Sequence, residues 1–336
     1  MWTNQFIEAT RHTSHPMVLA SPVGTTTNAG SGRGSVNLGL PPKGDLVALA
    51  VAVVFIALSG PVIAATAAPV LAIAFWRCLI GSGLTGLWVA FKERDSLQRL
   101  TRREWRLTLI SGIFLGLHFA TWIPSLVFTS VAASTALVAT QPIWAAFIAR
   151  AQGARISRGS WIGIWIALSG VLVLTGIDVR TDTRHLIGDA LALAGAIFAA
   201  AYVSVGAEVR KSVSTATMTF PLYGVAALTI LPLMFIFQQD LIGFELEAWL
   251  MILGITLGAQ LLGHTLMNKV LANSSATFVS LAILFEMPGA ALVAAIWLGQ
   301  APPVAIYPAA ALIITGVVFV IRSNPKKEIP METSPI

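Results

Sequence analysis

The sequence predicts an all-α integral membrane protein with ten transmembrane helices, built as two inverted five-helix repeats. Three observations predict this fold. Of the 336 residues, 56% are hydrophobic and only 11% are charged, whereas a soluble globular chain carries roughly 25% charged residues. The apolar residues form long blocks separated by short polar connections, which is typical of membrane-spanning helices. The two halves of the chain are also similar to each other.

The long apolar blocks define the spans. Each contains about 18–25 residues, which is enough to cross ~30 Å of hydrocarbon at ~1.5 Å per residue. The ten predicted spans are 45–66, 69–91, 107–127, 130–149, 159–176, 187–207, 217–238, 248–271, 275–298 and 303–321. Residues 1–43 are polar and lack a sustained apolar core, so we expect a disordered cytoplasmic tail rather than a signal peptide. Residues 323–336 are expected to form a second cytoplasmic tail.

The basic residues predict the orientation. With the N-terminus placed in the cytoplasm, 18 of the 21 Lys and Arg residues fall on the cytoplasmic side. Arg180 and Arg184 fall on the other side, and Arg77 lies inside a span. This asymmetry predicts a multi-pass protein of the cell inner (plasma) membrane with both termini in the cytoplasm. Because the positive charge is scattered through short connections, we expect the lipid bilayer as partner and no nucleic acid. The single cysteine, Cys78, excludes an intrachain disulfide.

The internal repeat appears when the first half is shifted by 146 positions without a gap. Seven positions then coincide: Gly112 with Gly258, His118 with His264, Ser134 with Ser280, Ala136 with Ala282, Pro142 with Pro288, Gly153 with Gly299 and Gly170 with Gly316. The first repeat is predicted at 44–177 and the second at 187–322. Five spans per repeat is an odd number, so the second repeat is inserted upside down. Inverted repeats with a binding site near the bilayer midplane are a recurrent transporter architecture.

Several local patterns carry a family resemblance over about residues 44–322. They are Phe75-Trp76-Arg77, Gly112 with His118, Ala133-Ser134-Thr135-Ala136, Pro142, Gly188-Asp189 with Ala201-Tyr202, Gly263-His264 with Asn268, and Leu284-Phe285-Glu286-x-Pro288. With these patterns and the predicted topology, the chain resembles the EamA-type permeases of the drug/metabolite transporter (DMT) superfamily. It departs from them in two places. Met287 separates Glu286 from Pro288, and Gln300 follows Gly299 where that family often has an acid.

The resemblance implies a secondary active transporter, not an enzyme, that moves a small metabolite such as an amino acid across the membrane, with export as the usual direction. Two alternatives are a membrane-embedded metal-dependent enzyme, using His118, His264 and Glu286 as ligands, and a passive channel. No Walker A, G-x-S-x-G or H-E-x-x-H motif is present, and neither a cofactor nor a resident metal is expected. The G-x-G-x-x-G letters from Gly81 to Gly86 lie inside a span, where no strand precedes them, so they do not indicate a dinucleotide site.

Two charged residues lie inside predicted spans. Glu286 falls about 16 Å into span 9, close to the midplane. A charge at that depth costs at least ~2.5–3.5 kcal/mol on insertion scales, so Glu286 is a candidate proton carrier or countercharge. Arg77 stays charged and should face the protein interior, where it could pair with Glu286 or hold a substrate carboxylate. The structural alternative is that each residue only satisfies neighbouring polar groups of the protein.

Polar and aromatic residues of spans 3, 6 and 8 complete the predicted substrate site. Gln260, His264 and Asn268 recur every four residues, so we expect them to share one helix face toward a central cavity. His118 and Trp122 of span 3 and Tyr202 of span 6 are predicted on the same cavity, with histidine also able to titrate. The alternative for each is interhelical hydrogen bonding or packing.

The mechanism predicted from the repeat is alternating access by rocking of the two halves. The substrate would lie between spans 3, 4, 8 and 9, with spans 1 and 6 closing the wall, and protons would be the coupling ion. The small-residue patterns Gly112-xxx-Gly116 and Gly254-xxx-Gly258 allow close helix approach. They would join either the two halves or two protomers of a homodimer.

Overall fold

The computed structural model describes residues 41–129, 134, 137–175, 183–289 and 304–323. The tails predicted at 1–43 and 323–336 lie almost entirely outside these residues, as do parts of predicted spans 4 and 9. Within the described ranges all regular structure is helical. Six helical stretches are long and apolar enough to cross a membrane, and they coincide with predicted spans 1, 2, 3, 6, 7 and 8: Lys43–Ile63, Val70–Lys92, Arg102–Phe128, Thr183–Val209, Thr215–Ile236 and Leu246–Val270. Three shorter apolar helices are Arg158–Val173, Ala276–Gly289 and Tyr307–Val320. The chain is therefore an integral membrane protein.

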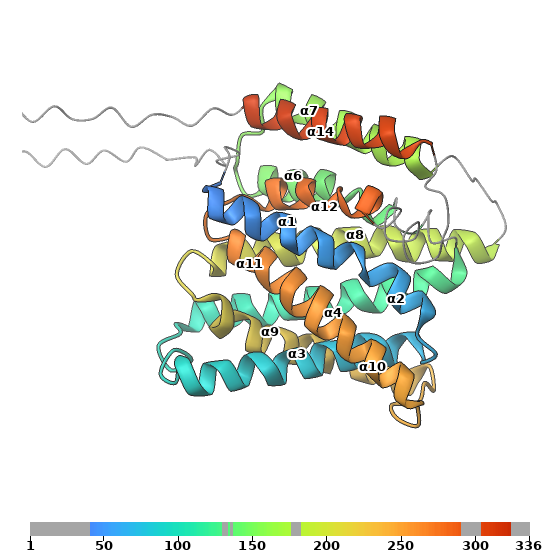
Figure 1. Cartoon of the computed structure of the whole chain (residues 1–336). Helices are drawn as coiled ribbons and strands as arrows, with labels where there is room; N and C mark the ends of the chain where they lie inside the picture. Colours follow the sequence, from blue (N-terminus) through green and yellow to red (C-terminus); the bar gives the residue numbers. More distant parts are fainter. Residues whose placement is uncertain (1–40, 130–133, 135–136, 176–182, 290–303, 324–336) are drawn as a thin grey trace, which may run out of the picture. The chain divides into compact units, whose positions relative to one another are not determined.

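The first repeat contains six described helices (Figure 1). They are α1 (Lys43–Ala57), α2 (Ser59–Ala65), α3 (Val70–Lys92), α4 (Arg102–Phe128), α6 (Gln141–Ala151) and α7 (Arg158–Thr175). α1 and α2 form one span that breaks at Leu58, because Pro61 has no N–H to donate to the carbonyl of Ala57. α4 begins with a capping box, in which the Thr101 side chain accepts from the Glu104 N–H and the Glu104 carboxylate accepts from the Thr101 N–H.

The second repeat contains seven described helical elements. They are α8 (Thr183–Val209), α9 (Thr215–Ile236), α10 (Leu246–Ile255), the π-helix η1 (Thr256–Thr265), α11 (Leu266–Val270), α12 (Ala276–Ile283) and α14 (Ile306–Arg322). α10, η1 and α11 follow one another without a gap and form a single span. Ser214 caps α9 and Ser275 caps α12, each accepting a hydrogen bond from a backbone N–H of the first turn.

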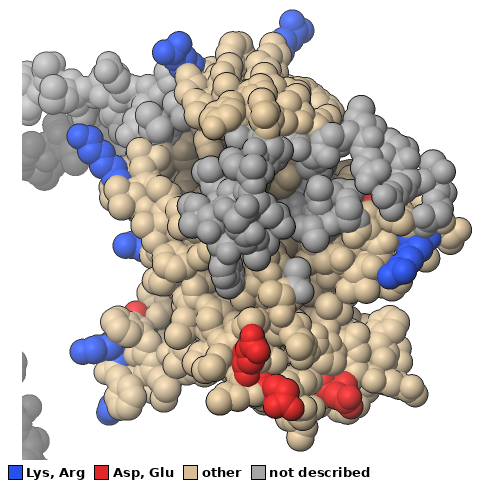
Figure 2. Space-filling model, turned by 45° about the vertical axis from the view of Figure 1, so that its right-hand side comes forward, with Lys and Arg blue, Asp and Glu red and all other residues tan. Residues whose placement is uncertain are grey.

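The surface of the helices suits lipid. Large apolar side chains of the spans are exposed, among them Trp88, Phe91, Leu228 and Phe235. In the face shown by Figure 2, the Lys and Arg side chains lie at the edges, most of the Asp and Glu side chains gather in the lower part, and tan surface separates the two groups. Exposed apolar side chains in this number would be a liability in water, and they are what the hydrocarbon core requires of a membrane protein.

Helices of the two repeats pack closely against each other. α4 packs along α8 and α9, and α3 packs against α9. A Cβ added at Gly112 would lie 2.7 Å from the carbonyl oxygen of Leu222, and one at Gly116 would lie 2.8 Å from that of Ala226. The first small-residue pattern therefore joins the two halves through α9. In the second pattern the two glycines differ: a Cβ at Gly254 meets nothing within 4 Å, whereas one at Gly258 would lie 3.3 Å from the Phe55 ring of α1.

α7 and α14 lie side by side (Figure 1) and carry a mark of the repeat. A Cβ on Gly163 would lie 2.7 Å from the carbonyl oxygen of Gly316, and one on Gly170 would lie 2.6 Å from that of Ala309. At the repeat shift of 146 positions, Gly163 is equivalent to Ala309, and Gly170 is equivalent to Gly316. The two close approaches are therefore equivalent contacts, which is the result expected when a pseudo-two-fold axis passes between α7 and α14.

Candidate functional site

A small cavity lies where segments of both repeats meet. Among the described residues its polar and aromatic lining comes from Ser59, His118, Trp122, Gln141, Tyr202, His264 and Glu286, and its apolar lining from Ile56, Val138, Ala199, Val203, Met267 and Ile283. These residues belong to predicted spans 1, 3, 4, 6, 8 and 9. The cavity volume is about 40 Å³, enough for roughly three water molecules. Small-molecule pockets usually measure roughly 300–1,000 Å³, so this conformation is closed around its centre.

The two histidines that the repeat relates face this cavity from opposite repeats. His118 of α4 lies with Nδ1 3.0 Å from the carbonyl oxygen of Gly195 on α8, and its ring stacks on that of Trp122 at a centroid distance of 5.6 Å. His264 of η1 meets the ring of Phe119 edge-on at 5.4 Å. His264 Nδ1 has no hydrogen-bond partner among the described residues. His118 is thus held in place by its neighbours, whereas His264 keeps a free ring nitrogen.

Two further lining residues carry polar atoms without a protein partner. Within the described part of the chain, the indole N–H of Trp122 and the hydroxyl of Tyr202 are buried and form no hydrogen bond. The amide of Asn268 lies near the Tyr202 hydroxyl, but not in a geometry that makes a hydrogen bond. Buried polar groups are nearly always paired, so partnerless ones beside a cavity indicate that water or a ligand completes them.

Glu286 is the acidic residue of the cavity wall. It follows α12, in the short helical segment that reaches Gly289. Its carboxylate forms no ion pair or hydrogen bond with Arg77, so the pairing considered from the sequence is not present in this conformation. The described residues also contain no group of three His, Cys, Asp or Glu side chains that could hold a metal ion. In this conformation His118, His264 and Glu286 are therefore not grouped as a metal site.

Arg77 lies behind the cavity wall, fully buried in α3. Its Nε donates to Gln260 Oε1 at 3.0 Å, its Nη1 to Ser59 Oγ at 3.4 Å, and its guanidinium carbon lies 4.3 Å from the centre of the Phe119 ring. Ser59 itself lines the cavity. Arg77 is therefore one hydrogen bond away from the cavity, through the residue at the break between α1 and α2.

The expected polar stripe of Gln260, His264 and Asn268 does not face the cavity as a unit. Only His264 of the three lines it, while Gln260 points to Arg77 on α3 and Asn268 is buried near Gly206 of α8. The reason is the π-helix, whose hydrogen bonds run from residue i to i+5, so a four-residue spacing no longer returns to the same face. The carbonyl of Gln260 in this wide turn accepts bonds from the hydroxyls of Tyr223 and Thr265.

Of the eight predicted site residues, five line the cavity: His118, Trp122, Tyr202, His264 and Glu286. Arg77, Gln260 and Asn268 lie outside its wall. Two polar lining residues, Ser59 and Gln141, were not predicted. A signal for both existed in the sequence, since each is a polar residue of an apolar span placed directly beside a Gly-Pro or Pro helix interruption.

The comparisons with known proteins decide the family. The sequence profile of the EamA-like transporter family matches residues 42–176 and again residues 186–322. The chain belongs to the EamA-like transporter family. It is accordingly a membrane transporter of the drug/metabolite type, and members of this family are transporters rather than enzymes. The search of curated proteins gave no match. One solved crystal structure of a protein resembles the chain with a TM-score of 0.69 at 17% identity, over 84% of this chain and 97% of that one. That likeness concerns the fold alone.

Proposed function

We propose that this EamA-like protein is a secondary active transporter that moves a small metabolite through the central cavity by alternating access. The observation that carries the proposal is the composition of the cavity wall. Repeat-related histidines, His118 and His264, meet there with Trp122, Tyr202 and the acid Glu286. In the proposed topology ten helices span the inner membrane and both termini are cytoplasmic, as the distribution of basic residues indicates. Export of an amino acid or a similar metabolite is the expected direction and cargo.

The chemistry of the wall suits a polar solute. Trp122 contributes a donor, Tyr202 a donor and acceptor, and His264 a ring nitrogen, all without protein partners in the described residues. A solute bearing carboxylate or carbonyl oxygens would satisfy the donors, and Glu286 would supply either a countercharge or a proton site. Because the cavity now holds only about 40 Å³, the wall must open before such a solute can bind.

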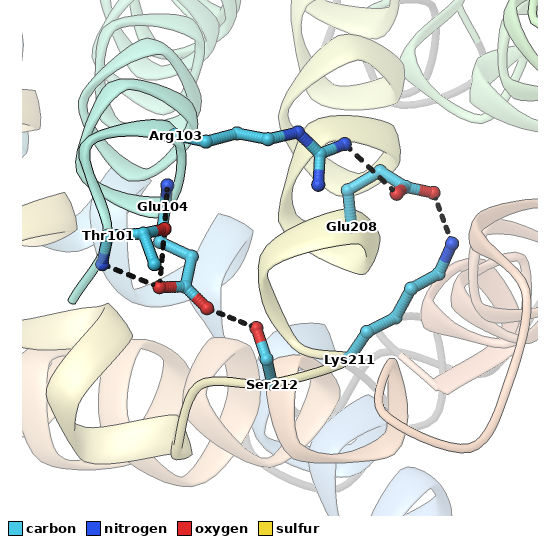
Figure 3. A network of polar contacts seen from close by, with 6 residues as sticks. All are labelled: Thr101, Arg103, Glu104, Glu208, Lys211 and Ser212. Carbon is cyan, nitrogen blue, oxygen red and sulfur yellow. Dashed lines mark hydrogen bonds and ion pairs between the residues drawn. The ribbon is translucent and has the colours of Figure 1, made fainter. Parts of the chain in front are cut away.

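The packing bears on which parts move. α3, α4, α8 and α9 are drawn from both repeats, yet glycine contacts hold α4 and α9 backbone against backbone. Polar contacts at one end of these helices add to this (Figure 3): Glu104 accepts from Ser212, and Arg103 and Lys211 both pair with Glu208. We therefore propose that these four helices stay together as a frame. The opening would come from the segments around it rather than from rocking of two intact halves.

The test is flux in proteoliposomes loaded with a panel of amino acids and other small metabolites, with and without a proton gradient. We expect saturable flux driven by the gradient in the wild type and uncoupled by Glu286→Gln. Glu245→Gln, an exposed acid at the start of α10, is the matched control and should behave as the wild type. Conductance that does not saturate with concentration would overturn the proposal in favour of a channel. Gradient-driven flux unchanged in Glu286→Gln would remove Glu286 from the coupling step.

A further inference from the structure

A second pocket opens at the end of the helices where α8 ends and α12 begins. Its volume is about 520 Å³, within the usual range for small-molecule sites. It lies between the end of α6, the last turns of α8 and the turn that joins α11 to α12. Its polar lining includes Gln152, Ser204, Glu208, Lys211, Asn273 and Thr277. In the topology proposed above, this is the cytoplasmic end.

The same helices line both this pocket and the central cavity. On α8, Ala199 and Val203 face the cavity, whereas Ser204 and Ala207 face the pocket. On α12 and the residues around it, Thr277 faces the pocket and Ile283 the cavity, six residues or ~9 Å further along. The two spaces are thus separated by about one layer of side chains.

Among the described residues, one side-chain hydrogen bond joins α6 of the first repeat to α12 of the second repeat near that layer. Gln141 of α6 donates from Nε2 to Ser280 Oγ of α12 at 2.8 Å, and both residues are buried. Gln141 lines the cavity, and Ser280 lies midway between Thr277 and Ile283. Val203 and Met267, which also line the cavity, are almost fully buried. The bond therefore ties α6 to α12 at the point where they would have to separate to connect the spaces.

The floor of the pocket holds buried hydroxyl groups without partners. Ser204 Oγ and Thr277 Oγ1 form no hydrogen bond to any described residue, although Thr277 is fully buried and Ser204 is 6% exposed. An unpaired buried polar group costs about 1–3 kcal/mol. Alanine at position 204 or valine at position 277 would fill similar space without this cost. The hydroxyls are explained if a polar solute or its water passes over them. The charged lining pair, Glu208 and Lys211, lies at the rim and is ion-paired.

We propose that this pocket is the vestibule in which a small neutral or zwitterionic polar solute is loaded, and that the Gln141–Ser280 hydrogen bond is the gate between it and the central cavity. The proposal rests on the transport function proposed above. It adds a second solute site, with Ser204 and Thr277 as its floor, and a pair of gate residues. Without this hydrogen bond, α6 and α12 would separate more readily. Solute and water would then reach the cavity from the vestibule more often.

Cysteine labelling tests the vestibule, because the native Cys78 is fully buried and can be replaced by alanine. The probe is a membrane-impermeant, charged methanethiosulfonate applied separately to each side of reconstituted vesicles. In the Cys78→Ala background, Ser204→Cys should be labelled from one side only, the side that also labels Lys211→Cys. Ala199→Cys in the cavity should be labelled at least tenfold more slowly from that side. Ala207→Cys replaces Ser204→Cys if the latter does not fold.

The gate is tested by adding Gln141→Ala or Ser280→Ala to Ala199→Cys. We expect each to raise the labelling rate of Ala199→Cys at least tenfold from the vestibule side, while Gln98→Ala, an exposed glutamine outside both pockets, leaves it unchanged. Equal labelling of Ala199→Cys with and without Gln141, or labelling of Ser204→Cys and Ala207→Cys from the opposite side, would overturn the inference. Labelling needs no substrate, so a chain with the expected pattern and no flux would refute the transporter proposal and keep the vestibule.

Discussion

The buried contact between Arg77 and Gln260 allows a quantitative prediction. Gln260→Met removes the acceptor of the Arg77 Nε–H while keeping an unbranched side chain of similar length. The Gln260 side chain packs beside Gly81, where an added Cβ would lie 3.1 Å from Gln260 Cγ, and methionine keeps the unbranched shape of this contact. Gln260 Nε2 has no partner among the described residues, so its removal costs nothing. The substitution therefore isolates one hydrogen bond to a charged group.

The expected cost follows from what Arg77 keeps. A hydrogen bond to a charged group contributes about 1.5–3 kcal/mol, and this one is 3.0 Å long. The remaining contacts are a long bond to Ser59 Oγ at 3.4 Å and the Phe119 ring at 4.3 Å. Neither can replace a good acceptor for a guanidinium that has no contact with solvent. We expect Gln260→Met to lower the free energy of unfolding by about 2–3 kcal/mol. Gln260→Glu, which retains the acceptor oxygen, should be close to neutral.

Reversible unfolding in mixed detergent–lipid micelles measures these free energies, and a double-mutant cycle with Arg77→Met isolates the pair. The coupling energy should be at least about 1.5 kcal/mol, because Gln260→Met should hardly change the free energy of unfolding once Arg77→Met has removed the buried charge. A Gln260→Met variant within about 0.5 kcal/mol of the wild type, or a coupling energy near zero, would refute the assignment of Gln260 as the partner of the buried charge.

Three further predictions concern other parts of the molecule. Gly116→Ala should destabilise the chain by about 1–3 kcal/mol, because its Cβ would lie 2.8 Å from the carbonyl oxygen of Ala226. Gly254→Ala is the control and should not destabilise it, because a Cβ there meets nothing within 4 Å. Equal effects of the two substitutions would contradict the close packing of α4 on α9. At Glu93, burial acts to raise the pKa, but hydrogen bonds from Ser214, Thr217 and Trp88 and the charge of Arg210 outweigh it, so the pKa lies below its ordinary value of 4.5. The ionised carboxylate therefore stabilises the fold above about pH 4.5, and this contribution shrinks as the pH falls toward and through the lowered pKa. Glu93→Gln should therefore lower the thermal midpoint more at pH 7 than at pH 3.5. A midpoint difference that grows on acidification would contradict this sign. His118→Phe should keep the ring stacked on Trp122 and lose the hydrogen bond with the Gly195 carbonyl. We therefore expect this substitution to reduce flux more than it reduces stability. Unchanged flux would exclude a polar role for this ring.

The helices and the family could be predicted from the sequence because both depend on features that a linear pattern retains. The spans follow from apolar length, and the repeat from residues matched at one shift. His118 and His264 were predicted on one cavity for the same reason, since a pseudo-two-fold axis brings equivalent residues to related places. Trp122 and Tyr202, chosen as polar or aromatic residues of neighbouring spans, also line that cavity.

Other parts of the site depended on local backbone geometry that residue spacing does not reveal. The spacing of Gln260, His264 and Asn268 predicts one face only if the backbone is α-helical, and the π-helix over Thr256–Thr265 sends Gln260 to Arg77 instead. Ser59 enters the cavity wall because the span breaks at Leu58, and Gln141 because it begins α6 beside Pro142.

The sequence by itself determined that this chain crosses a membrane and that it is built from two similar halves, because hydrocarbon selects for apolar length and a repeat leaves matched letters. Tertiary structure alone decided which polar residues meet. Arg77 pairs with Gln260 across 183 positions, and Gln141 with Ser280 across 139. Such pairs depend on how two distant helices are rotated and how closely they approach. Glycines such as Gly112 and Gly116 set that approach through backbone contacts that no single-sequence pattern specifies.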